Sequence, residues 1–331
     1  MKEESPSESG ILLLLLDGRW YFCPGRLSQQ TSISSNRMYL RSPLLILPVV
    51  FSWTLTLFQP QLTSLSPSKA SQLAALEVAA SSANASRSNL LVVPELYLTG
   101  YNLDAALSPE PRGGASYSAV SAMSSKFNLS IVFTYAELGS DGKIYDSAVI
   151  FGRDGTPLLD FRKVNLAAGE GLFLSPGDAI GPVVEIDGVR VGLIICFDVF
   201  LPEPARILAL SRADVILVPT ANGYPPNVFN SVADLIVPAR ALENDAFVAY
   251  VNWVQTGPPG APFPEIWTFY GHTTLSDPGG NILYTGPSNA SSLVHFDLGD
   301  FPDGDTGSST AIGRVAGDLN GLCANVTLRP D

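Results

Sequence analysis

The chain has 331 residues, 46% of them hydrophobic and 15% charged, which suits one large α/β domain with buried sheets and an appendage. The net charge of −12 argues against a nucleic-acid surface, and no glycine-rich phosphate loop of the expected form is present. The three cysteines, Cys23, Cys196 and Cys323, have neither a disulfide framework nor metal-ligand spacing, so they favour a reducing, cytoplasmic location over a secreted or membrane-anchored one.

Residues 1–50 precede the first predicted core strand, and we expect them to be disordered or outside the fold. The early charges Lys2, Glu3 and Glu4 do not give the basic start of a signal peptide. The apolar run from Pro43 to Phe58 contains prolines and is shorter than the ~20 residues that a membrane-spanning helix requires. A membrane anchor is therefore the less favoured interpretation.

From residue 51 onward, segments with strand character alternate with helical segments. The first predicted helix, 67–83, has Ser66 as its N-cap and Pro67 at its first position. The other predicted helices are 117–126, 203–211 and 230–244, and the predicted strands are 54–58, 90–93, 130–134, 147–151, 189–196, 215–219, 247–252 and 273–276. Such alternation predicts the α/β class.

Three of these apolar stretches end beside a residue that carries chemistry. Glu95 follows strand 90–93, Lys163 follows a second strand end, and Cys196 ends strand 189–196. A thiol reacts only as thiolate, with a pKa near ~8.5 when free, so a catalytic cysteine needs a base or a cation beside it. Taken separately, each residue has an ordinary alternative, an inert buried cysteine or a solvated loop charge. A Cys-His protease is disfavoured because His272 and His295 both lie well after Cys196, in contexts untypical of a base.

In this order and context the three residues resemble the Glu-Lys-Cys triad of the nitrilase or carbon-nitrogen hydrolase superfamily. The resemblance runs from about Trp53 to Asp297. The segments that carry it are Pro94-Glu95 with Thr99-Gly100-Tyr101, Arg162-Lys163 with Leu166 and Glu170, Cys196-Phe197-Asp198 with Phe200 and Pro202-Glu203, Ala239 to Asn244, Val251-Asn252, Gly271-His272-Thr273, and Asp277 to Gly280.

The resemblance implies a four-layer αββα sandwich with subunits that pair face to face, as a homodimer or higher homo-oligomer. It also implies roles for four residues. Cys196 would be the nucleophile that forms a thioester, and Glu95 would be the general base and acid. Lys163 would stabilise the oxyanion together with the backbone N–H of Phe197, and Glu170 would hold the lysine. No metal and no cofactor is expected, since these groups supply every chemical requirement.

The implied substrate is a small-molecule amide. The residues after Cys196 look more like the amidase and carbamoylase branches than the nitrile-cleaving branch, which usually carries Trp-Glu after its cysteine. Candidate pocket residues are Tyr101, Phe197, Asn222 and Tyr224, because they follow strand ends that bear or neighbour the triad.

Several alternatives stay open: a nitrile or N-carbamoyl hydrolase of the same family, a membrane-linked acyl or amide transferase, and a non-catalytic binding member. The predicted organisation is an N-terminal extension (1–50), a carbon-nitrogen hydrolase domain (51–300) and a C-terminal tail (301–331), which lacks the basic, aromatic ending common in the family.

Overall fold

The computed structural model describes residues 11–16, 19–24, 52–62, 67–101, 108–224, 232–255 and 268–299. The chain divides into two units, Met1–Val49 and Val50–Asp331. In the first unit, β1 (Ile11–Leu16) pairs antiparallel with β2 (Arg19–Pro24). That residues 1–50 lie outside the fold stays a prediction. Among the described residues, no helix has the length and apolar character needed to cross a membrane.

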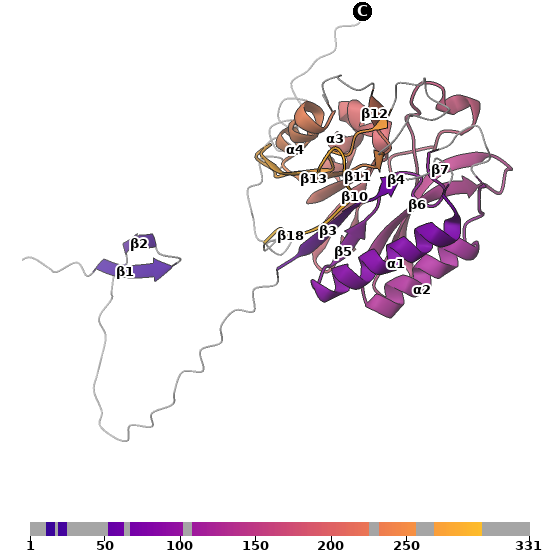
Figure 1. Cartoon of the computed structure of the whole chain (residues 1–331). Helices are drawn as coiled ribbons and strands as arrows, with labels where there is room; N and C mark the ends of the chain where they lie inside the picture. Colours follow the sequence, from indigo (N-terminus) through magenta and orange to yellow (C-terminus); the bar gives the residue numbers. More distant parts are fainter. Residues whose placement is uncertain are drawn as a thin grey trace, which may run out of the picture. The chain divides into compact units, whose positions relative to one another are not determined.

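The second unit contains two six-stranded sheets (Figure 1). The first sheet has the order β18 (Ser292–Asp297), β3 (Thr54–Gln59), β5 (Leu90–Val92), β6 (Ser130–Leu138), β7 (Ile144–Phe151), β8 (Pro157–Arg162). The second has the order β17 (Ile282–Thr285), β16 (Thr274–Ser276), β13 (Phe247–Val251), β11 (Val215–Pro219), β10 (Val189–Leu193), β9 (Val184–Ile186). Two short pairs are added, β4 (Gln61–Leu62) with β14 (Val254–Gln255) and β12 (Gly223–Tyr224) with β15 (Thr268–Phe269).

Helices connect the parallel strands at the centre of each sheet. In the first sheet β3, β5 and β6 are parallel and are joined through α1 (Lys69–Ala85) and α2 (Ala115–Phe127). In the second, β10, β11 and β13 are parallel and are joined through α3 (Pro202–Leu210) and α4 (Val237–Asn244). Parallel strands place their carboxyl ends at the same edge of a sheet, where sites are commonly built.

Alternation along the strands defines the layers. Leu90 and Val92 of β5 pack in the cluster between the two sheets, whereas Leu91 packs in the cluster under α1 and α2. Val215 and Leu217 of β11 likewise join the central cluster, whereas Ile216 and Val218 join the cluster that contains residues of α3 and α4. Since successive side chains point to opposite faces, each sheet is buried on both sides.

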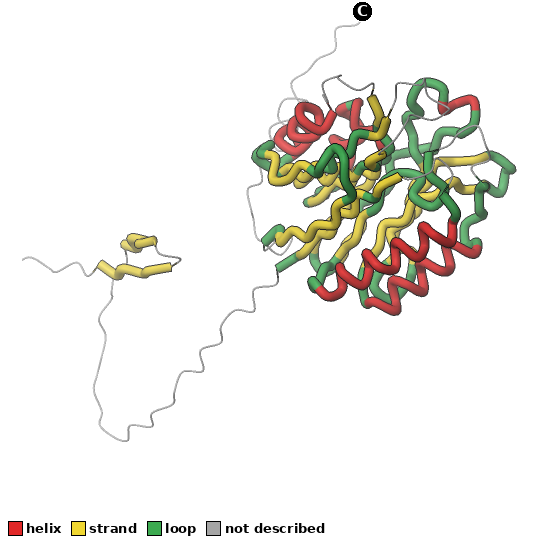
Figure 2. The backbone as a smooth tube through the Cα atoms, viewed as in Figure 1, coloured by secondary structure: helices red, strands yellow, loops and turns green. Residues whose placement is uncertain are grey.

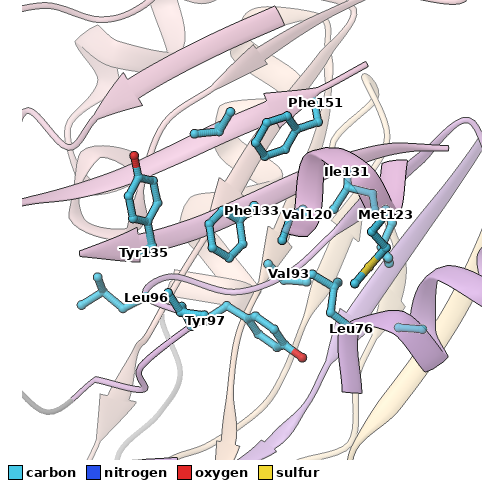
Figure 3. Close-up of a cluster of buried hydrophobic side chains, with 14 of the residues drawn as sticks. Leu76, Val93, Leu96, Tyr97, Val120, Met123, Ile131, Phe133, Tyr135 and Phe151 are labelled. Carbon is cyan, nitrogen blue, oxygen red and sulfur yellow. The ribbon is translucent and has the colours of Figure 1, made fainter. Parts of the chain in front are cut away.

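These clusters give four layers, helix, sheet, sheet and helix, so the predicted αββα sandwich is confirmed. Figure 2 shows the helices on the outside of the strands. Figure 3 shows how the outer cluster of the first sheet is built: Met123 of α2 lies beside Ile131 of β6, and Leu76 of α1 lies beside Val93.

Several predicted boundaries were wrong, among them those of the first helix, of the strand before Cys196 and of the helix 230–244. Helix α1 begins two residues later than predicted, because its N-cap is Ser68, whose side chain accepts the hydrogen bond from the Ser71 N–H (3.1 Å); Ser66, the predicted N-cap, lies outside the described residues. Strand β10 ends at Leu193, and Cys196 starts a 3₁₀ turn, Cys196–Phe200. The predicted helix 230–244 is described from 232 on, as a π-helical turn, Val232–Ile236, followed by α4.

Candidate active site

The three predicted residues come from three strand ends. Glu95 follows β5 by three residues, Lys163 directly follows β8, and Cys196 follows β10 by three residues. All three are buried, with Glu95 and Lys163 at 0% exposure and Cys196 at 7%. The charges of Glu95 and Lys163 both act on the thiol of Cys196, so the sheets bring the three groups within electrostatic reach.

The Glu95 carboxylate is held at both oxygens. Oε1 accepts a hydrogen bond from Lys163 Nζ at 2.6 Å, and Oε2 accepts one from the backbone N–H of Ala221 at 2.6 Å. The backbone carbonyl of Glu95 accepts from Trp253 Nε1 at 2.8 Å, and the next residue, Leu96, has a φ of +47°. Residue 221 follows β11, so both sheets fix the orientation of this carboxylate.

The Lys163 ammonium lies between carboxylates. Besides Glu95, its Nζ donates to Glu170 Oε1 at 2.7 Å and lies 3.7 Å from Asp146 Oδ2. Burial lowers the pKa of Lys163, but the charges of Glu95, Cys196 and Glu170 outweigh burial and place the pKa well above its ordinary value. The side chain is therefore a permanent cation at neutral pH.

Glu170, on the 3₁₀ turn Glu170–Leu172, is anchored by three donors. In addition to Lys163, the hydroxyl of Tyr101 donates to Oε1, and the backbone N–H of Ala167 donates to Oε2 at 2.6 Å. Burial raises the pKa of Tyr101 well above its ordinary value, so its hydroxyl remains a donor. Glu170 thus gives the lysine a second hydrogen-bonded carboxylate beside Glu95.

Cys196 lies on a tight turn between β10 and α3. Its φ of +44° is a left-handed conformation that few residues other than glycine adopt. Such backbone strain is typical of functional turns. Burial raises the pKa of the Cys196 thiol well above its ordinary value, the charge of Glu95 raises the pKa further, and the charge of Lys163 lowers it in part. The resting group is therefore a thiol that needs a base.

Asp198 ties this turn to the lysine loop. Its Oδ2 accepts from the Ile195 N–H at 3.0 Å, and its Oδ1 accepts from both the backbone N–H (2.7 Å) and the side-chain Nδ2 (2.9 Å) of Asn165. Asn165 is two residues after Lys163. The Asp198 carboxylate therefore sets the position of the turn that carries Cys196 relative to the loop after Lys163, a role that the sequence analysis did not assign.

The sequence analysis missed Asp146 altogether. It lies in the middle of β7, is completely buried, and adds a third carboxyl group beside Lys163. Carboxyl oxygens of Glu95, Asp146 and Glu170 lie within 4.8 Å of one another, a grouping that can hold a metal ion. In this chain the cation that they surround is the Lys163 ammonium.

The candidate pocket residues are placed as follows. Tyr101 is buried and contacts Phe269 edge-on, with ring centroids 6.0 Å apart. Phe197 is half-buried and stacks on Phe200 at 4.9 Å. Asn222 is fixed through its backbone to Asn252, and its Nδ2 has no hydrogen-bond partner among the described residues. Tyr224 lies in β12, and its side chain is outside the described residues.

Comparisons with known proteins identify relatives of this chain. A sequence model of the family described as carbon-nitrogen hydrolase matches residues 55–300, more than half of the chain. The chain is 38% identical over 174 residues to a protein of Pseudomonas protegens named as a hydrolase in the pqqF 5' region, which covers 51% of this chain and 60% of that protein. It is 34% identical over 213 residues to an (R)-stereoselective amidase of Pseudomonas sp, which covers 63% of this chain and 73% of that protein.

A solved structure shares the fold. It is a mutant of the amidase from Nesterenkonia sp. AN1, with the acetamide moiety of fluoroacetamide added covalently at the active site cysteine. The two chains superpose with a TM-score of 0.67 and 26% sequence identity, over 81% of this chain and 98% of that one. The chain is thus similar to that amidase over nearly the whole length of the latter.

Proposed function

Because the chain belongs to the carbon-nitrogen hydrolase family, we propose that it hydrolyses the amide of a small carboxylic acid through a thioester on Cys196. One observation carries this proposal: the buried thiol shares its site with a carboxylate, Glu95, that is hydrogen-bonded to a buried ammonium, Lys163. Such a site supplies a nucleophile, a base and a cation for a developing oxyanion.

In the first half-reaction, Glu95 accepts the proton of the Cys196 thiol as the sulfur attacks the carbonyl carbon of the amide. The tetrahedral oxyanion is stabilised by the Lys163 ammonium and by the backbone N–H of Phe197. Glu95 then passes the proton to the departing nitrogen, the carbon–nitrogen bond breaks, and ammonia or an amine leaves behind a thioester.

In the second half-reaction, water takes the place of the amine. Glu95 removes a proton from the water molecule while its oxygen attacks the thioester carbon, and the same two donors again stabilise the oxyanion. The carbon–sulfur bond then breaks, the proton returns to the sulfur, and the carboxylic acid is released. Glu170 keeps Lys163 in place throughout, through the 2.7 Å hydrogen bond.

Two comparisons support an amide substrate in particular. The (R)-stereoselective amidase is named for that activity, and the cysteine of the Nesterenkonia amidase takes up an acetamide group. The side chains of Tyr101, Phe197 and Asn222, together with Tyr224, are proposed to contact the acyl part of the substrate. A substrate with a short acyl chain fits a thiol that is only 7% exposed.

The test is ammonia release from a panel of aliphatic amides, N-carbamoyl amino acids and nitriles, with Cys196→Ala as the matched control. Release from amides that disappears in the variant supports the proposal. Release from nitriles or N-carbamoyl compounds alone would replace it with the corresponding activity. Conversion of amides only when an acceptor amine is added would identify a transferase instead, and a wild-type protein that turns over none of these would identify a non-catalytic member.

We further propose that the chain forms a homodimer or higher homo-oligomer through α3, α4 and the π-helical turn before α4. Large apolar side chains are exposed there: Ile207 and Leu210 on α3, Leu235 on the π-helical turn, and Leu242 on α4. Exposed apolar groups on neighbouring elements are typical of an interface between copies. Sedimentation of the wild type and of a Leu235→Lys, Leu242→Lys variant tests this: a multimer that dissociates in the variant is expected, and a monomeric wild type contradicts it.

A further inference from the structure

The carboxyl group of Asp146 accepts no hydrogen bond from the described residues. It lies on β7 with no exposed surface, and neither of its oxygens has a hydrogen-bond partner among the described residues. Its backbone is conventionally paired, since its carbonyl accepts from the Lys163 N–H at 2.8 Å. A buried polar side chain is normally hydrogen-bonded, so an unpartnered carboxyl group next to the reacting groups requires an explanation.

The charges of the cluster indicate the protonation state of its carboxyl groups. Three carboxyl groups, those of Glu95, Asp146 and Glu170, share one ammonium in a site closed to solvent. If all three were ionised, the site would carry two uncompensated negative charges, which a buried environment strongly disfavours. At least one of the three therefore holds a proton.

The distribution of hydrogen-bond donors indicates which carboxyl group holds the proton. Glu95 accepts two hydrogen bonds, from Lys163 and from the Ala221 N–H, and Glu170 accepts three. Asp146 accepts none from a side chain or an N–H group, so its ionised form is the least stabilised. Burial, followed by the charge of Glu95, raises the pKa of Asp146 well above its ordinary value, against the opposing charge of Lys163.

We propose that Asp146 is a positioning residue that stays a neutral carboxylic acid, and that its neutrality leaves one N–H of Lys163 available for the oxyanion. This inference rests on the proposed amide hydrolysis. The ammonium has three N–H bonds, and two of them are donated to Glu95 and Glu170. An ionised Asp146, whose Oδ2 lies 3.7 Å from Nζ, would compete with the oxyanion for the third.

A neutral Asp146 also has an acceptor for its own proton. The carboxylate of Glu95 lies within the same 4.8 Å group of oxygens, and it is the negative charge that acts most strongly on Asp146. The other titratable groups of the cluster are Lys163 and Glu170. The charges of Tyr101 and Cys196 act on Lys163 in turn. No cation other than Lys163 acts on Asp146 among these groups, so nothing further in the cluster offsets a negative charge on Asp146.

Infrared spectroscopy tests the protonation directly. A protonated carboxyl group absorbs at a higher frequency than a carboxylate, so the difference spectrum between the wild type and Asp146→Asn at neutral pH should contain the band of one protonated carboxyl group. Only carboxylate bands in that difference spectrum would overturn the proposal. This reading does not require turnover, so it decides the state of Asp146 even if the proposed amidase activity is not found.

Kinetics test the positioning role. Asp146→Ala removes the carboxyl group and should lower kcat/KM on the best amide by roughly 10- to 100-fold. A catalytic group that is misplaced by about 1 Å can lower the rate by about 100-fold. Asp146→Asn, which keeps the size and the neutrality, should restore most of this loss. Its alkaline limb of kcat/KM should also lie at higher pH than that of the wild type, because it has no carboxyl group to ionise.

A structural role alone predicts a different outcome. Thermal unfolding of both variants controls for folding, and activities are compared only below the unfolding transition. An Asn variant as impaired as the Ala variant, or an alkaline limb that does not move, would overturn the proposal and show that the charge of Asp146 is required. If the wild type hydrolyses no amide at all, the proposed function fails, and the infrared result alone then decides the state of Asp146.

Discussion

The ammonium of Lys163 lies 2.6 Å from Oε1 of Glu95, and neither side chain is exposed. The proposed base is therefore paired directly with the proposed oxyanion donor. This pairing holds the carboxylate in place, and it would let the lysine reach an oxyanion formed close to the position from which the proposed base works. Both consequences depend on a pair that stays intact when the substrate enters.

Glu95→Gln should lower kcat for amide hydrolysis by about 10²- to 10⁴-fold, the usual contribution of a general base. The amide can still accept the hydrogen bond from the Ala221 N–H, so the fold should be retained. Ammonia release under steady-state conditions is the measurement. Glu77→Gln is the matched control, because Glu77 is an exposed glutamate that pairs with Lys126 on the surface. A Glu95→Gln enzyme with the wild-type rate would remove Glu95 from the mechanism.

Alkylation of Cys196 by iodoacetamide should be slow at neutral pH and should rise through the alkaline range. Burial and the charge of Glu95 raise the thiol pKa above its ordinary value of 9.0, so little thiolate exists at pH 7. The rate is followed by mass spectrometry of the peptide that contains Cys196, which separates it from Cys23 and Cys323. A rate that is already maximal near neutral pH would show a preformed thiolate and contradict the role of Glu95 as base.

Asp198→Asn should reduce kcat/KM and lower the stability. Whichever way the amide is turned, its NH₂ group faces either the N–H of Ile195 or the two donors of Asn165. Leaving one buried donor unpaired costs about 1–3 kcal/mol. Urea unfolding measures the stability, and Asp234→Asn, on the π-helical turn away from these contacts, is the control. An unchanged free energy of unfolding with unchanged activity would show that the turn does not depend on Asp198.

Glu137→Gln should lower the free energy of unfolding at neutral pH and have little effect on it at low pH. Burial raises the pKa of Glu137, but hydrogen bonds from Arg162 and Ser147 lower the pKa by more, so the folded pKa lies below the unfolded one. The contribution of this carboxylate is therefore complete above the unfolded pKa of about 4.3 and is lost as the pH falls through the folded pKa. Urea unfolding of both proteins from pH 7 down to pH 3 should show two stabilities that converge at low pH. A constant difference would contradict this origin.

The strands and the residues at their ends could be predicted because the signals are local. Leu90 to Val93 and Val215 to Pro219 are short apolar runs bounded by polar residues, and the structure has strands there. Glu95, Lys163 and Cys196 could be singled out because each lies at or shortly after the end of such a run. The four layers required the resemblance to a known family, since periodicity does not indicate which strands share a sheet.

What could not be predicted depends on contacts between distant segments. Asp146 lies inside a strand, between Tyr145 and Ser147, and only the folded chain brings it beside Lys163, which is 17 positions further on in the sequence and whose Nζ lies 3.7 Å from Asp146 Oδ2. Similarly, Asp198 is visible in the sequence, but its partner Asn165 is 33 residues away. The N-cap at Ser68 could not be chosen from the sequence, because a serine side chain can cap a helix from either position.

The most direct test of the account is a search for the thioester by mass spectrometry of the intact protein and of its peptides, after rapid acid quenching during turnover of the best amide. The account predicts an added acyl group on the peptide with Cys196, which lies between Arg190 and Arg206, and no adduct in Cys196→Ala. Amide hydrolysis that persists in Cys196→Ala would contradict it.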